Sequence, residues 1–102
     1  YGNIFFTDNP AEAVKNADFV YTDSYNYHTP ATAEERKILN PYQVNNSLMI
    51  AAKHNAAFMH PLPATRGIEV TEDVIDGKNS LVYVQSENKL HVIKAVLALL
   101  IK

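Results

Sequence analysis

The chain has 102 residues, which suffices for one small domain and is too short for two. Nine basic and eleven acidic residues give a formal net charge of -2, which argues against a nucleic-acid or membrane partner. The sequence has no cysteine, which excludes a disulfide framework and a thiolate metal site, and no apolar run long enough to span a membrane. We therefore expect a cytoplasmic protein. Because the first residue is Tyr1 rather than methionine, we also expect a piece of something longer.

The first third of the sequence alternates β-rich runs with polar breaks. Residues 3–7 are β-rich and predict the first strand, and residues 8–10 (Asp-Asn-Pro) can cap a short helix over residues 11–16. Residues 17–22 predict a buried strand. The polar and aromatic residues 24–32 then predict a loop.

Thr32 and Glu35 form the Thr-x-x-Glu capping-box pattern and predict a helix to about Leu39. A further helix is expected after Asn45, where apolar residues recur at helical spacing. Residues 56–59 are apolar and predict the third strand.

The last third predicts a short helix over residues 71–77, a fourth strand over residues 81–84 and a long helix over residues 87–102. Short apolar strands that alternate with helices are typical of a parallel sheet covered on both faces. The predicted fold is therefore α/β, a three-layer, Rossmann-like parallel sheet with a long C-terminal helix. That helix is apolar on most sides, so it requires a large partner surface.

Polar side chains follow three of the predicted strands. Asp23 ends the second strand, His60 ends the third, and residues 85–88 end the fourth. Because the carboxyl ends of parallel strands meet at one edge, Asp23 and His60 could lie together, where a carboxylate would orient an imidazole. The loop over residues 59–67 also holds two prolines, an arginine and a glycine, so it is either a rigid turn or a ligand site.

Arg66 and Lys89 could anchor an anionic ligand, although solvated surface charges are the simpler interpretation. His54 and His91 fall at helical positions and are interpreted as surface or packing residues. No metal-ligand spacing and no glycine-rich phosphate loop is present, so we expect neither a metal nor a cofactor.

Four segments, taken together, resemble the ornithine carbamoyltransferase family. They are residues 17–23, residues 34–45 with "EER" and "PYQVN", residues 59–77 with "MHPLPATRG", "EVT" and "VIDG", and residues 87–95 with "ENKLH" and "KA". The segments occur in the family's order and spacing over nearly the whole chain.

The resemblance implies a carbamoyltransferase that moves a carbamoyl group from carbamoyl phosphate to the amine of ornithine or a related acceptor. It implies a two-domain fold in which residues 1–86 form part of the acceptor-binding α/β domain. Residues 87–102 would be the final helix, which packs on an N-terminal domain absent from this chain. The resemblance also implies a homo-oligomer, a trimer in the full-length protein, with no cofactor and no nucleic-acid or membrane partner. The isolated chain would be inactive.

Site residues follow from the same resemblance. Asp23 and His60 match catalytic positions, with Asp23 holding the acceptor's amino group and His60 at the carbamoyl end. Leu62 matches the residue whose carbonyl contacts the carbamoyl amide, and the Leu62–Pro63 bond is a candidate cis peptide. Lys89 stands where the family has an arginine that contacts carbamoyl phosphate.

Two departures from the ornithine pattern face the acceptor and leave its identity open. Pro61 replaces a cysteine, and Tyr27, His28 and Thr29 replace a "SMG" segment. Substrate binding is accordingly assigned to seven residues: Asp23, Tyr27, His28, His60, Pro61, Leu62 and Lys89. The alternatives are a catalytically silent paralogue that binds a small molecule or regulates a partner, and a generic α/β domain whose match is only architectural.

Overall fold

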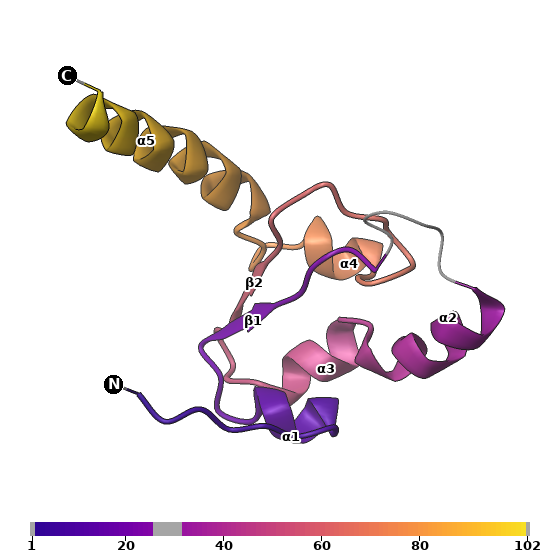
Figure 1. Cartoon of the computed structure of the whole chain (residues 1–102). Helices are drawn as coiled ribbons and strands as arrows, with labels where there is room; N and C mark the ends of the chain where they lie inside the picture. The colour runs from indigo at the N-terminus through magenta and orange to yellow at the C-terminus, as the bar shows by residue number, and fades with distance from the viewer. Residues whose placement is uncertain (1, 26–31, 102) are drawn as a thin grey trace.

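The computed structural model describes residues 2–25 and 32–101. In chain order the elements are α1 (Pro10–Val14), β1 (Phe19–Tyr21), α2 (Ala33–Leu39), the 3-10 helix η1 (Asn40–Tyr42), α3 (Asn46–Ala51), β2 (Ala57–Met59), α4 (Glu72–Ile75) and α5 (Val82–Leu100) (Figure 1). Helices and short strands thus alternate along the chain, as in an α/β fold.

The two strands form a parallel pair in which Val20 lies opposite Phe58 and Tyr21 opposite Met59. Val20 and Phe58 point to the same face and are buried, because successive side chains of a strand alternate between faces. The parallel sheet and the long C-terminal helix confirm the predicted fold class. Phe19 and Tyr21, on the other face of β1, are 60% and 57% exposed, so that face is largely open within the described residues.

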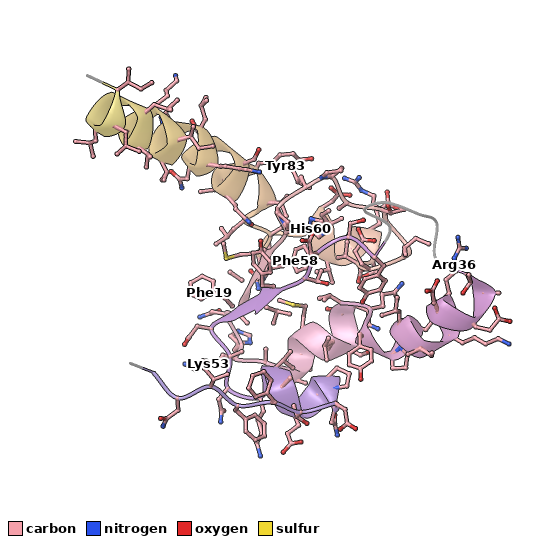
Figure 2. All side chains as sticks on the ribbon, viewed as in Figure 1. Phe19, Arg36, Lys53, Phe58, His60 and Tyr83 are labelled. Atoms are coloured by element: carbon pink, nitrogen blue, oxygen red, sulfur yellow. The ribbon has the colours of Figure 1, made fainter. Side chains whose placement is uncertain are left out.

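The core lies between this strand pair and helices α1, α3 and α4. Phe58 is fully buried near its centre (Figure 2). The other buried members of the cluster are Val14, Val20, Val44, Val70, Val74, Ile75 and Val82. Val44 and Val70 join two loops by a parallel bridge, so the core also fixes the segment that leads from the β2 loop into α4.

Side-chain caps begin three of the helices at the residues that the sequence indicates. Asn9 accepts hydrogen bonds from the backbone N–H groups of Ala11 and Glu12 at the start of α1. Thr32 and Glu35 form the complete capping box of α2, and the backbone N–H of Thr32 holds the pKa of the Glu35 carboxyl below its usual range. Asn45 caps α3 through its side-chain oxygen. These local signals were predictable because each cap bonds groups only two or three residues away.

Two predicted strands are wrong. Residues 3–7 contain no strand, and the side chains of Ile4 and Phe6 are 80% and 87% exposed, since no neighbouring strand covers them. Residues 81–84 are not a fourth strand either. The chain bridges β2 only at Ser80, and α5 then begins at Val82.

The run of β-branched and aromatic residues at 81–84 is typical of a strand, which is why the sequence misled us. The backbone N–H of Leu81 donates to the Phe58 carbonyl, and the N–H of Gln85 already donates to the Leu81 carbonyl as the helix starts. The predicted helix start at Glu87 was therefore five residues late. The predicted domain boundary between residues 86 and 87 falls inside α5.

Helix α5 points away from the rest of the chain (Figure 1). Val82 is its one buried residue, whereas most of its large apolar side chains are about half exposed or more. No helix in the described part of the chain is long and apolar enough to cross a membrane.

Candidate active site

Three segments meet at the carboxyl edge of the strand pair. The backbone N–H of Thr22 donates to the Met59 carbonyl at 3.3 Å, so β1 and β2 leave the sheet together. Asp23 follows β1, and His60 follows β2. The first turns of α5 approach the same edge, because the side-chain oxygen of Gln85 accepts the backbone N–H of His60 at 3.0 Å. The structure therefore gathers the predicted strand-end residues at one place.

The loop after β2 is ordered by its own side chains. The Leu62–Pro63 peptide is cis, which confirms that expectation, and Leu62 has a positive φ of 54°. The Leu62 N–H donates to Nδ1 of His60 at 2.9 Å. At the far end Gly67 has φ of 83°, a value that favours glycine, and its N–H donates to the Val70 carbonyl. The loop therefore has a defined conformation that its own hydrogen bonds maintain.

His60 lies at the centre of this arrangement and is fully buried (Figure 2). Its Nε2 lies 3.4 Å from Oε1 of Glu69, which is also fully buried. Among the described residues, His60 forms hydrogen bonds with Leu62 and Gln85, while its Nε2 lies near the Glu69 carboxylate without a hydrogen bond to it. None of the hydrogen bonds or ion pairs of His60 with described residues involves Asp23. Both ring nitrogens thus face protein groups.

Asp23 is exposed, and its Oδ1 accepts the backbone N–H of Ser24 at 2.7 Å. Its second carboxylate oxygen makes none of the hydrogen bonds that the structure gives to described residues. Asp23 therefore lies exposed at the carboxyl edge of the sheet.

A pocket of about 360 Å³ lies beside this edge, between the strand ends and α5. Its lining includes Tyr21, Pro61, Gln85 and Lys89, with apolar walls from Val92 and Ile93. Pro61 and Lys89, two predicted substrate-binding residues, therefore share one cavity. Tyr27 and His28, two others, lie outside the described residues.

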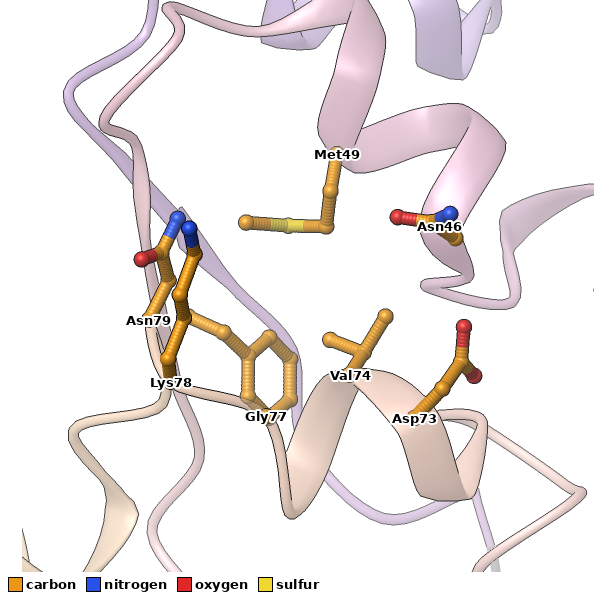
Figure 3. A pocket seen from close by; sticks show the side chains of 8 residues that line it. Asn46, Met49, Asp73, Val74, Gly77, Lys78 and Asn79 are labelled. Atoms are coloured by element: carbon orange, nitrogen blue, oxygen red, sulfur yellow. The ribbon is translucent and has the colours of Figure 1, made fainter.

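A second pocket, of about 220 Å³, opens between α3 and the turn after α4 (Figure 3). Met49, Val74 and Lys78 line it, and it contains none of the predicted site residues. The described residues contain no group of three histidine, cysteine, aspartate or glutamate side chains that could hold a metal.

Arg66 is part of the framework. Its Nε and an Nη donate to the two carboxylate oxygens of Asp76 at 2.8 and 2.7 Å, the two-pronged geometry that suits a guanidinium. Hydrogen bonding to Arg66 holds the pKa of the Asp76 carboxyl below its usual range. This ion pair joins the β2 loop to the end of α4, so the Arg66 guanidinium is already bound to a carboxylate of the protein.

His54 and His91 are exposed surface residues, as expected.

Comparison with known proteins identifies the family. The model of the aspartate/ornithine carbamoyltransferase Asp/Orn-binding domain matches residues 2–100. The chain belongs to the aspartate/ornithine carbamoyltransferase family. It is 55% identical over 96 residues to the ornithine carbamoyltransferase of Hyperthermus butylicus, covering 92% of this chain and 31% of that protein. It is 52% identical over 102 residues to the enzyme of Pyrococcus horikoshii, covering 98% and 32%.

Solved structures agree with this assignment to the carbamoyltransferase family. The ornithine carbamoyltransferase of Pyrococcus furiosus superimposes with a TM-score of 0.82 at 52% identity, over 88% of this chain and 29% of that one. The enzyme of Thermus thermophilus gives a TM-score of 0.84 at 39% identity, over 96% of this chain and 32% of that one. The chain thus spans about a third of the length of the curated relatives it matches.

Sequence reasoning assigned no supporting role to three residues of this domain. Glu69 faces His60, Gln85 accepts the His60 N–H, and the side-chain amide of Gln43 donates to the carbonyls of Gly67 and Ile68 at 3.0 Å. The available signal for Glu69 was a single carboxylate between apolar Ile68 and Val70, a position where a charge is costly unless it is paired.

Tyr25 adds a titratable group next to this cluster. Burial, more than any other cause, raises the pKa of its hydroxyl above 10.0, and the nearby Glu69 carboxylate adds to the rise. Folding therefore favours the protonated phenol, so this stabilisation is complete below about pH 10 and is lost as the pH rises through the folded pKa. Between pH 8 and pH 10.5 we expect the free energy of unfolding, measured with urea, to fall less in the Tyr25→Phe variant than in the unmodified chain. Equal losses in both proteins would contradict this expectation.

Proposed function

We propose that this chain is the acceptor-binding part of a carbamoyltransferase, which transfers a carbamoyl group from carbamoyl phosphate to ornithine or a related amine. The family match over residues 2–100 carries the proposal. Relatives that are 44% to 55% identical bear the name ornithine carbamoyltransferase, which supports ornithine as the acceptor. The silent-paralogue alternative gains no support from these relatives.

In the proposed reaction, the lone pair of the neutral amine attacks the carbamoyl carbon and forms a C–N bond. The C–O bond to phosphate breaks, phosphate leaves with the bonding electrons, and the nitrogen releases a proton. The protein contributes mainly orientation and charge stabilisation, both of which lower the barrier without a covalent enzyme intermediate.

The roles of the residues follow from their family positions, and the placement of Asp23, Pro61 and Lys89 supports three of them. Exposed Asp23 would hold the acceptor's amino group, and the Leu62 carbonyl would contact the carbamoyl amide. Pro61 would face the acceptor across the shared pocket, with Lys89 supplying positive charge near the phosphate. His60 remains a predicted site residue, although its side chain is fully buried in the chain. Tyr27 and His28 are proposed for the acceptor side from sequence alone.

The same proposal assigns residues 1–86 to the acceptor-binding domain and gives the apolar C-terminal helix an N-terminal domain to pack against. The exposed apolar side chains of α5 support this, because a soluble protein rarely leaves a surface of that kind uncovered. A homotrimer is proposed for the full-length protein from the family resemblance.

A carbamoyl-transfer assay on the full-length protein tests the function. Radiolabelled carbamoyl phosphate would be supplied with ornithine, putrescine and other amines in parallel. We expect labelled carbamoyl product, with ornithine the best acceptor. If another amine were carbamoylated faster than ornithine, the proposed acceptor would change but the reaction class would stand. The absence of turnover with every amine would contradict the proposal.

A further inference from the structure

We propose that Glu69 is a positioning residue, whose carboxylate braces the β2 loop through a hydrogen bond from Thr65 and an electrostatic contact with His60, and thereby fixes where the Leu62 carbonyl points. This inference rests on the proposed function for its catalytic meaning. The brace itself stands on contacts among described residues.

The first step concerns the pair of buried side chains. His60 and Glu69 both have no exposed side-chain surface, and Nε2 of the ring lies 3.4 Å from Oε1 of the carboxylate. A buried carboxylate costs free energy unless polar groups surround it, and packed apolar side chains would serve stability as well or better. A specific geometric role is a good reason for glutamate at this position.

The second step fixes the direction of the contact. Leu62 donates its backbone N–H to Nδ1 of His60 at 2.9 Å, so Nδ1 carries a lone pair and no proton. The proton of a neutral ring is then on Nε2, the atom that faces Glu69. The imidazole therefore turns its lone pair to Leu62, and its other nitrogen lies 3.4 Å from the Glu69 carboxylate, an electrostatic contact without a hydrogen bond.

The third step links both ends of the loop. Oε1 of Glu69, the oxygen nearest to Nε2 of His60, accepts a short hydrogen bond from the backbone N–H of Thr65. One carboxylate oxygen thus faces His60 where the loop begins and binds Thr65 five residues later. Gln85 holds the His60 backbone from α5. Leu62 lies between these anchors, and its own N–H is bound to His60, so little freedom is left for its carbonyl.

The brace also suggests how a fully buried histidine contributes to the site. The ring directs both nitrogens at groups of the protein rather than at the pocket that Pro61 and Lys89 line. His60 then acts by transmitting the position of Glu69 to Leu62, as a positioning residue rather than a group that touches substrate.

The test compares Glu69→Ala and Glu69→Gln in the full-length protein. Glu72→Ala is the matched control, because Glu72 is an exposed glutamate on the adjacent helix α4. Steady-state kinetics with carbamoyl phosphate and ornithine would be normalised to the folded fraction. We expect Glu69→Ala to lower kcat at least tenfold with KM for ornithine within about twofold of the control. Glu69→Gln, which retains an acceptor oxygen for Thr65, should recover part of the lost kcat.

Amide hydrogen exchange gives a readout that needs no activity. We expect peptides covering residues 60–67 to exchange at least tenfold faster in Glu69→Ala than in the control, with peptides of α1 and α2 unchanged. Unchanged exchange over residues 60–67 would overturn the brace, even if the unmodified protein turns over no amine. Faster exchange with an unchanged kcat would overturn its role in positioning. If the unmodified protein itself showed no turnover, that result would count against the proposed function and not against the role of Glu69.

Discussion

Replacing Asp23 with asparagine is expected to lower kcat/KM for the amine acceptor on the order of 100-fold in the full-length protein, the scale of a lost orienting group. The proposed role of Asp23 is to hold the acceptor's amino group through its negative charge. Asparagine keeps an oxygen for the Ser24 N–H, which Asp23 accepts at 2.7 Å, so the local backbone should be retained. The substitution therefore removes the charge and little else.

Asp18→Asn is the matched control for this experiment. Asp18 stands at the other end of the same strand, where its exposed carboxylate pairs with Lys53 at 2.7 Å. Such surface pairs contribute little to stability, so turnover should stay close to that of the unmodified protein. Binding of carbamoyl phosphate should be unaffected in both variants. If Asp23→Asn matched Asp18→Asn within threefold, Asp23 would not be the group that holds the amine.

Local chemistry explains which parts of the fold could be predicted from the sequence. Asn9, Thr32 and Asn45 each cap a helix within a few residues of themselves, and the apolar run of β2 is bounded by a proline-rich loop. These features depend on neighbours along the chain. The cis peptide at Leu62–Pro63 was expected from the family resemblance rather than from local physics.

The supporting contacts of the candidate site were not predictable because they join distant segments. Gln85 reaches His60 across 25 positions of the sequence, and Gln43 reaches Ile68 across another 25. Nothing in the local pattern of either glutamine specifies its partner. The expected contact between Asp23 and His60 followed from sheet topology alone. The structure places both residues at the predicted edge but gives the imidazole a glutamate from the following loop.

The C-terminal helix is apolar in sequence but exposed in the structure. Its apolar positions predict burial, yet the side chains of Leu99 and Leu100 are 78% and 75% exposed. The apolar composition is a property of the sequence, whereas the surface that we propose covers these side chains would come from another domain or another copy of the chain. In the isolated 102-residue chain we expect this helix to drive self-association.

Replacing Ile93 and Leu97 together with lysine tests this expectation, since both are about half exposed and lie four residues apart on α5. Burying one such side chain contributes about 1.5–3 kcal/mol. Because each side chain is already about half buried, losing both should weaken association by roughly 1.5–3 kcal/mol, about 10- to 100-fold in Kd. Sedimentation velocity should show the unmodified chain as an oligomer and the variant as a monomer.

Asn88→Lys with His91→Lys is the control pair, because it adds two lysines to the same helix and removes no aliphatic side chain. Both positions are exposed, so the helix should be retained, as circular dichroism can verify. If this control dissociated as fully as the Ile93 and Leu97 variant, added charge would be the cause rather than the apolar surface. A monodisperse monomer of the unmodified chain at tens of micromolar would refute the expectation directly. It would also weaken the proposal that α5 packs on an N-terminal domain, because both inferences depend on the same uncovered side chains.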